Sequence, residues 1–315
     1  MTSTPGTTQI EGIPTSETRG VYGGTDDADN SGVLKYVSIR HGGTDVGAGN
    51  EINGLTLAGV GSGTVIEHIE VIANKDDGVE FFGGTVSAKW VLTAFCGDDN
   101  YDYDEGWRGN GQFWVVVAAD DAGDRGGEHD GGTDPETASP FATPSIWNAT
   151  YIGRGITAGK RALTFRDNAG GSYSNSVFFN WGKGVDVENL ESGDDSYARF
   201  VAGDLSLNGN VFYNTVVSGN GATEADLFKI SMGSWSNATD SMTELATSTA
   251  ALQATFAAGN NSVEDPGLAW DLNAGSIQLV PQNSLSEGTA PGGTWFENVT
   301  YKGAFDPNGT NWVKG

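Results

Sequence analysis

Closely spaced carboxylates are the residues of this sequence best suited to chemistry. Two segments 22 residues apart, Asp76–Phe81 and Asp98–Tyr103, share the same order of acidic, small and apolar residues. The candidate metal ligands in and beside them are Asp76, Asp77, Glu80, Asp98, Asp99, Asp102 and Asp104. Carboxylates this close repel one another unless a cation lies between them. Calcium accepts roughly six to eight oxygen ligands, so the cluster predicts calcium as a cofactor.

The same residues are equally compatible with a plain solvated acidic surface, and this alternative stays open. The chain contains 41 acidic and 16 basic residues, which gives a net charge of −25. Such a charge suits a salty medium, in which self-repulsion is screened. It repels the phosphates of nucleic acids and of anionic lipids, so nucleic acid is not an expected partner.

A single cysteine and the lack of long apolar runs argue against a disulfide-stabilised protein and against a membrane protein. Cys96 excludes an internal disulfide and is expected to be a small buried residue. No apolar run approaches the ~20 residues that span a membrane, so membrane insertion is not expected. No signal peptide is visible. An extracellular or cell-surface location is therefore inferred from the composition, with an export signal already removed.

Short strands between glycine-rich turns must position the carboxylates. Glycine accounts for 48 of 315 residues, which is typical of many turns and unfavourable to long helices. The first expected strands are Val33–Arg40, Ile52–Leu57, Val65–Val71 and Val79–Phe82. A period in the low twenties without intervening helices predicts an all-β fold, a right-handed single-stranded parallel β-helix (β-solenoid). Stacked coils would place Glu80 beside Asp102, about 4.8 Å away.

The pattern divides the chain into three regions. Residues 1–31 are expected to form an irregular leading segment, residues 32–235 the parallel β-helix, and residues 236–315 a terminal coil with a cap. Residues 118–145 hold few apolar anchors. We expect them to form a long loop that projects from the β-helix, and such loops often have functional roles.

One helix is expected, at about residues 240–258. Its apolar face would consist of Leu245, Leu252 and Phe256. Ser241 and Glu244 have the spacing of a capping box. A helix here would cap the last coil, whose open edge could otherwise pair with other chains.

Three stretches of the sequence are distinctive: Gly32–Gly43, Asn50–Gly84 with its run NEINGLTLAGVGSGTVIEHIEV, and Val299–Gly315. They resemble a family of secreted bacterial β-helix proteins, most of unknown function. The resemblance implies a right-handed parallel β-helix, export to the cell surface or the medium, and further coils upstream in a longer precursor. It implies no catalytic residues. More distantly, the architecture resembles that of pectate lyases and polygalacturonases, which does not establish an activity.

Catalysis on an acidic polysaccharide is the alternative function. Gly97-Asp98-Asp99 resembles the doubled aspartate of polygalacturonase-like glycosidases, but the three histidines lie in no matching motif. The densest basic group consists of Lys160, Arg161 and Arg166. Arg166 is a candidate to hold a uronate during β-elimination, although an ion pair with Asp167 explains it as simply. The candidate catalytic residues are therefore Asp98, Asp99 and Arg166.

Tryptophan is frequent, with nine residues, and provides a candidate glycan platform. Trp107 and Trp114 flank the acidic cluster and are the candidate glycan-binding residues, with packing inside the coil as the alternative. The leading hypothesis is an exported, non-catalytic surface, adhesion or assembly module, stabilised by calcium, with polysaccharide as its partner. Self-association through the coil ends into filaments is a third possibility.

Overall fold

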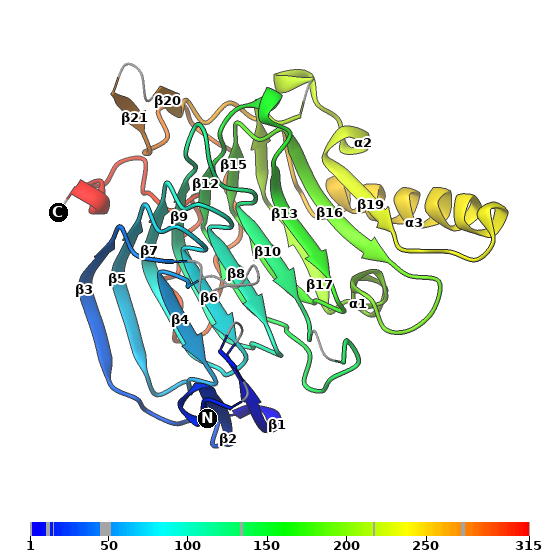
Figure 1. The fold of residues 1–315 in the computed structure, drawn as a ribbon. Helices are drawn as coiled ribbons and strands as arrows, with labels where there is room; N and C mark the ends of the chain where they lie inside the picture. The colour runs from blue at the N-terminus through cyan, green and yellow to red at the C-terminus, as the bar shows by residue number, and fades with distance from the viewer. Residues whose placement is uncertain are drawn as a thin grey trace.

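Short strands recur along the chain and pair with strands one coil later, which produces two long parallel sheets (Figure 1). The computed structural model describes residues 2–10, 13–14, 16–44, 52–132, 135–216, 218–271 and 275–314. The front sheet contains β4 (Leu55–Ala58), β6 (Val79–Phe82), β8 (Tyr101–Asp104), β10 (Gly127–Asp130), β13 (Arg161–Arg166), β16 (Lys183–Asn189) and β19 (Phe228–Met232). The predicted parallel β-helix is therefore confirmed.

The second sheet, called the bent sheet here, closes each coil. Its first members are the long strands β3 (Val33–Arg40), β5 (Val65–Ile72), β7 (Ser87–Ala94) and β9 (Asn110–Val117). In later coils each long strand is replaced by two short ones: β11 (Ser145–Trp147) and β12 (Thr150–Ile152), β14 (Gly171–Ser174) and β15 (Val177–Phe179), and β17 (Leu205–Asn208) and β18 (Val211–Tyr213). β9 pairs with both β11 and β12, so each such pair continues one long strand.

The bend in this sheet is made by single residues with left-handed backbone. Tyr36, His68, Trp90 and Phe113 have φ between 53° and 59°, and the same position is taken in later coils by Asn148, Asn175 and Gly209. The rings of Tyr36, His68 and Trp90 stack, with centroids 4.7 Å apart. Asparagine tolerates this geometry and bulky residues seldom adopt it. Asn168, Asn175, Asn180 and Asn214, at turns of the later coils, also have positive φ.

Aromatic side chains fill the interior of the coils. Trp107 and Trp114 are both 0% exposed, and their indole N–H groups donate to the backbone oxygens of Val86 and Ala88. Phe81 stacks on Trp107 with centroids 4.0 Å apart. The prediction that these two tryptophans form a glycan platform is therefore wrong. Trp114 points inward from β9, and Trp107 does so from the turn between β8 and β9, where burial of their large apolar area stabilises the β-helix.

The two ends of the β-helix are built differently. Near the first coils, β1 (Thr2–Gln9) pairs antiparallel with β2 (Val21–Thr25), so the leading segment is not wholly irregular. The helices α1 (Ser196–Ala202), α2 (Glu224–Leu227) and α3 (Ala238–Ala258) lie toward the last coils (Figure 1). The remaining elements are β20 (Ala269–Asp271), β21 (Ser276–Gln278) and four short 3-10 helices, η1 (Thr18–Gly20), η2 (Ile156–Ala158), η3 (Gly219–Gly221) and η4 (Trp312–Lys314).

The predicted helix near residues 240–258 corresponds to α3. It begins earlier than expected, because Asn237 rather than Ser241 caps it by accepting from the N–H groups of Thr239 and Asp240. Leu252 is buried, whereas Leu245 is exposed. The Gln253 amide donates to the Phe228 oxygen on β19 over 3.2 Å, so the C-terminal half of α3 covers the last coil. None of the described helices is both long and apolar enough to cross a membrane.

After α3, the C-terminal segment (residues 260–271 and 275–314) returns across the outside of the bent sheet. The Ser262 N–H donates to the Asn210 oxygen in the last coil. Further along, the Asn148 amide donates to the Tyr301 oxygen over 2.7 Å. Trp312 finally contacts His68 of an early coil edge to face, with centroids 6.4 Å apart. The segment thus covers the outer face of the bent sheet, whereas Ile10 and Ile13 of the leading segment reach the acidic cavity of the front sheet.

Candidate cation site on the front sheet

The outer face of the front sheet displays aligned rows of carboxylates. Because strand residues alternate between the two faces, the second and fourth residues of β6, β8 and β10 point outward. Parallel pairing places Glu80 beside Asp102, and Asp102 beside Glu128. The neighbouring row ends with Asp130 beside Arg166. The predicted neighbour pair Glu80–Asp102 is therefore confirmed, and it belongs to a longer row.

Three groups of carboxylates on this face have oxygen atoms within 4.8 Å of one another. They are Asp76, Asp77 and Asp98; Asp77, Glu80 and Asp102; and Asp98, Asp99 and Asp124. Six of the seven predicted ligands belong to these groups. Asp104, the seventh, lines the same cavity of about 400 Å³ but belongs to none of the three.

Electrostatic repulsion and burial act together on these carboxyls. Burial, and then the neighbouring charges of Asp99 and Glu80, raise the pKa of Asp77 well above its usual range. Burial and then Glu80 and Asp77 do the same to the pKa of Asp102. Oδ1 of Asp102 is fully buried and has no hydrogen-bond partner among the described residues. A buried acceptor without a donor is costly, so the Asp102 oxygen is a position at which a cation would be stabilising.

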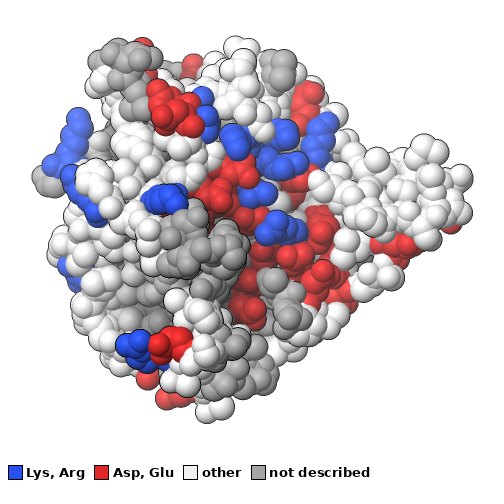
Figure 2. Space-filling model, in the orientation of Figure 1, with Lys and Arg blue, Asp and Glu red and all other residues white. Residues whose placement is uncertain are grey.

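Arginine side chains border the acidic cluster toward the later coils. Arg125 contacts Asp99 at 3.0 Å and Glu128 at 2.9 Å. Arg166 forms two hydrogen bonds to the Asp130 carboxylate and also contacts Glu128 at 2.9 Å. Figure 2 shows the acidic side chains gathered in the middle of this face, with basic side chains beside them. Arg125 and Arg166 therefore add positive charge at the later-coil side of the acidic cluster.

Sequence reasoning missed part of this site. Glu128 and Asp130 lie on β10, inside residues 118–145, which were expected to form a projecting loop. That prediction is wrong for Gly127–Asp130, which pairs with β8 and β13. Its inward positions are Gly127 and His129 instead of apolar residues, which concealed the strand. The acidic residue at the second position, shared with Glu80 and Asp102, was the available signal.

The site is chemically suited to a hard cation. Every donor in the three groups is a carboxylate oxygen, and calcium prefers oxygen ligands. The amide of Asn53 donates to Glu80 and orients it at the edge of the cavity. Asp77 Oδ1 accepts from the Asp99 N–H over 2.9 Å, which holds consecutive coils together at the site. Asp77, Glu80 and Asp102 are thus the residues that would hold a bound cation.

The candidate catalytic residues occupy different surroundings. Asp99 is paired with Arg125, and burial followed by the Asp99 charge raises the pKa of Asp98 to about 6. The Arg166 guanidinium lies among Asp130, Glu128 and Asp167, and its bonds to Asp130 outweigh its burial and raise its pKa further. An arginine held in this way keeps its proton and serves to neutralise the carboxylates around it.

Comparison with known families agrees with this architecture. Residues 7–271 match the family described as the pectate-lyase-like β-helix domain. The chain belongs to this family. No curated protein and no solved structure matches the sequence. Membership in the family establishes the β-helix, whereas the reaction or ligand has to be argued from the residues of the front sheet.

Proposed function

We propose that this member of the β-helix family is an extracellular, calcium-binding surface module. The observation that supports it best is the group of Asp77, Glu80 and Asp102, whose oxygens lie within 4.8 Å of one another. Asp102 adds a buried oxygen without a hydrogen-bond partner in the described structure. A calcium ion would replace mutual repulsion by attraction and would fasten consecutive coils, because its ligands come from different strands.

Thermal unfolding in calcium and in EDTA tests this proposal. Calcium at a hundred times its Kd should add about 2.7 kcal/mol to the free energy of unfolding, which raises Tm by several degrees. Sodium chloride at matched ionic strength controls for screening of the net charge of −25. Equal melting temperatures in calcium and in EDTA would contradict the proposal.

The variant Asp102→Asn locates the effect. It keeps the shape of the side chain and removes one charged ligand, so the calcium-induced rise in Tm should fall by at least half. In EDTA the variant should be no less stable than the wild type, because it relieves repulsion from Glu80 and Asp77. Asp120→Asn, on an exposed residue outside the three groups, is the matched control and should keep the full rise.

Hydrolysis or elimination on an acidic polysaccharide is a second candidate. It is supported by two carboxyls on this face, Asp98 and Asp130, whose pKa values are raised to about 6 mainly by burial. A carboxyl that titrates near neutral pH can act as a general acid or base. Incubation with uronate polymers, followed by measurement of reducing ends and unsaturated products, separates the candidates. Turnover that Asp98→Asn abolishes would establish an enzyme and reject the purely binding module.

A further inference from the structure

Two of the described lysine side chains are buried, Lys89 and Lys302, and their charges are balanced to different degrees. The Lys89 ammonium contacts the Glu297 carboxylate at 3.0 Å. Lys302 is 3% exposed, and the carboxylate that it contacts, that of Glu264, lies 3.9 Å away. Burial therefore lowers the pKa of Lys302, although the Glu264 charge opposes this shift. A buried amine of this kind can give up its proton and act as a base.

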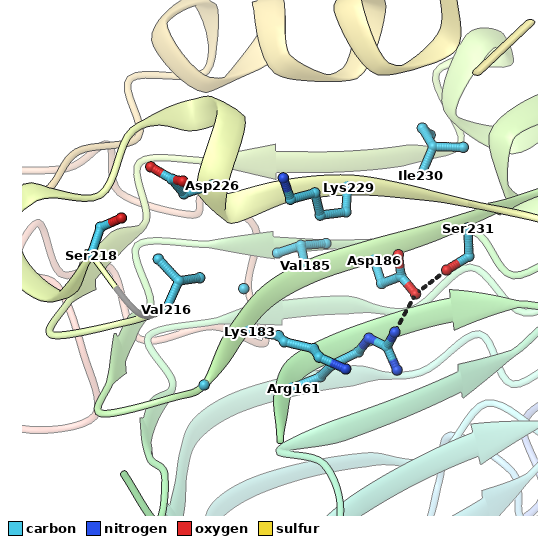
Figure 3. Close-up of a pocket in the computed structure, with 12 residues that line it drawn as sticks. Arg161, Lys183, Val185, Asp186, Val216, Ser218, Asp226, Lys229, Ile230 and Ser231 are labelled. Atoms are coloured by element: carbon cyan, nitrogen blue, oxygen red, sulfur yellow. Dashed lines mark hydrogen bonds and ion pairs between the residues drawn. The ribbon is translucent and has the colours of Figure 1, made fainter. Parts of the chain in front are cut away.

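The lysines at the cavity of the front sheet near its last strands are of a different kind. Lys183 and Lys229 line that cavity and are exposed (Figure 3). Arg161, beside them, already contacts Asp186 at 3.3 Å. An ammonium in contact with solvent keeps its proton at neutral pH. Neither of these two lysines is therefore suited to act as a base, whereas Lys302 is.

The Lys302 amine lies beside a serine that is itself held by Glu264. Nζ of Lys302 donates to Oγ of Ser286 over 2.9 Å, and the Ser286 hydroxyl donates to Oε1 of Glu264 over 2.6 Å. The Ser286 N–H donates to Oε2 of Glu264 over 2.8 Å, so two bonds fix the serine on this carboxylate. Burial opposes ionisation of Glu264, but bonds from Ser262 and Ser286 outweigh it and lower its pKa. A hydroxyl within reach of an amine, with a carboxylate that orients it, is the arrangement that activates a serine nucleophile.

This group opens into a cavity of about 680 Å³ that Ser286 and Lys302 both line. Its walls come from the bent sheet and from the C-terminal segment, and Ser286 is exposed there. Asn208 and Asn260 line the same cavity, and neither side-chain amide forms a hydrogen bond with a described residue. Attack on a carbonyl group creates an oxyanion that needs hydrogen-bond donors, and these two amides are available to provide them.

We propose that Ser286 is the nucleophile of an acyl-transfer site that hydrolyses carboxylic esters, with Lys302 as its general base. The hydroxyl hydrogen turns from Glu264 to the Lys302 amine, Oγ of Ser286 bonds to the carbonyl carbon of the ester, and the proton passes to Nζ. The bond to the alcohol oxygen then breaks, that oxygen takes the proton from Lys302, and the acyl group stays on Ser286. Water attacks the acyl-serine, again with Lys302 as base, which releases the carboxylic acid and restores the serine. Glu264 is a positioning residue that orients the hydroxyl and stabilises the transient ammonium.

The walls of the cavity indicate the class of ester. Apolar side chains are few among the described residues that line it, with Trp147 as the largest. The other side chains are mainly amides and hydroxyls, including those of Asn175 and Thr289. A long acyl chain would find little apolar surface there, whereas a short acyl group on a polar alcohol fits the lining. The site uses none of the carboxylates of the front sheet, so it does not depend on the calcium proposal.

Hydrolysis of p-nitrophenyl acetate by the full chain in EDTA tests the proposal. We expect a burst of p-nitrophenol and then a slower steady release, because acylation of the serine precedes hydrolysis of the acyl-serine. Peptide mass spectrometry of protein quenched during the burst should find the acetyl group on Ser286. Acetyl groups on exposed lysines alone, or release of p-nitrophenol no faster than in buffer, would overturn the proposal.

Three variants separate catalysis from a network that only fastens the C-terminal segment. Ser286→Ala removes the nucleophile at an exposed position and should lower the rate by about a hundredfold or more. Lys302→Arg keeps the positive charge but cannot take up a proton, so it should lower the rate to a similar extent. Ser284→Ala, at another exposed serine, is the matched control and should leave the rate unchanged.

The outcome for Ser286→Ala decides between the two roles of the network. A variant that melts earlier but hydrolyses the ester at the wild-type rate would show that Ser286 only fastens the segment, and the proposal would fail. Loss of both the burst and the acetyl group, with the native circular dichroism spectrum retained, supports catalysis. This comparison remains decisive if Lys302→Arg does not fold, because it rests on the exposed serine alone.

Discussion

The two outer faces of this β-helix are built on the same coils, but their outward side chains differ in polarity. On the front sheet, outward positions hold carboxylates and basic residues, and the leading segment meets the acidic cavity through Ile10 and Ile13. On the bent sheet, the outward positions of β9, β12 and β15 are apolar, as in Val115, Ile152 and Phe179. They form a second core with Phe305 and Leu279 of the C-terminal segment.

At the boundary of this second core, the polarity of the outward residues changes together with the coverage by the C-terminal segment. Leu92 on β7 belongs to it, yet its neighbours in register are Glu70 on β5 and then Ser38 on β3. The outward residues thus become polar where the C-terminal segment ends, near His68 and Trp312. An apolar outer row therefore predicts a covering segment, whereas a charged outer row lines a polar cavity, as Glu80, Glu128 and Asp130 do.

The largest expected effect comes from removing an anchor of the covering segment. Phe305 is 0% exposed and stacks on Trp312 with centroids 5.5 Å apart. Phe305→Ala should lower the free energy of unfolding by about 3–5 kcal/mol, because it leaves a cavity between the segment and the bent sheet. Denaturant unfolding measures this loss. Met242→Ala on exposed α3 should cost less than about 0.5 kcal/mol, and equal effects of the two variants would refute the second core.

The second prediction concerns the pH dependence of the free energy of unfolding, which the titrating carboxyls of the front sheet should dominate. On the front sheet, burial raises the pKa of Glu128 to about 9 and that of Glu188 to about 7. Carboxyls with raised pKa values hold protons that the unfolded chain has released, so their contribution to stability is lost as pH rises through those values. In EDTA, lowering the pH from 9 to 6.5 should therefore increase the free energy of unfolding, by about 2 kcal/mol.

Above pH 6.5, the pH dependence of the free energy of unfolding reports on these carboxyls and not on histidine. The fully buried His129 has its pKa lowered to about 3 and opposes stability only below its ordinary value of 6.5. Calcium should flatten the profile, since it stabilises the ionised carboxylates. Chemical denaturation at several pH values, with and without calcium, measures both effects. A free energy of unfolding that rises from pH 6.5 to 9 in EDTA would show that these carboxyls do not control stability.

The part of the site that could be predicted from the sequence is the part that repeats. Asp76–Phe81 and Asp98–Tyr103 do lie on successive coils, because their shared order of residues reflects equivalent positions in a stack. β10 could not be recognised, since His129 occupies an inward position where an apolar residue was expected. His129 is accommodated there by a bond of 2.9 Å between its Nε2 and the Tyr173 hydroxyl and by stacking on Tyr103. Such tertiary partners are invisible in a local pattern.

Orientation was the second limit. The position of Trp107 and Trp114 beside the acidic cluster suggested a surface platform, because the local sequence does not show which side chains of a strand or turn face inward. The sequence pattern also predicts a terminal coil with a cap for residues 236–315, whereas the C-terminal segment covers the bent sheet. Its contacts with Gln112 and Lys89 span 185 and 208 residues in sequence, and no periodic signal connects such distant positions.

The smallest expected effect tests the polar attachment of that segment. Gln112 is 0% exposed, donates to the Glu297 oxygen over 2.9 Å and accepts from the Glu297 N–H over 2.8 Å. Gln112→Ala should cost about 1–2 kcal/mol in the free energy of unfolding, because two backbone groups of the segment lose their partner. Gln282→Ala, which removes one exposed bond to the Val280 oxygen, is the control and should be nearly neutral. Hydrogen exchange should become faster at the Glu297 N–H and remain unchanged on β8. Faster exchange on β8 as well would mean that the covering segment and the front sheet unfold as one unit. Faster exchange confined to the segment would show that the two faces are stabilised independently.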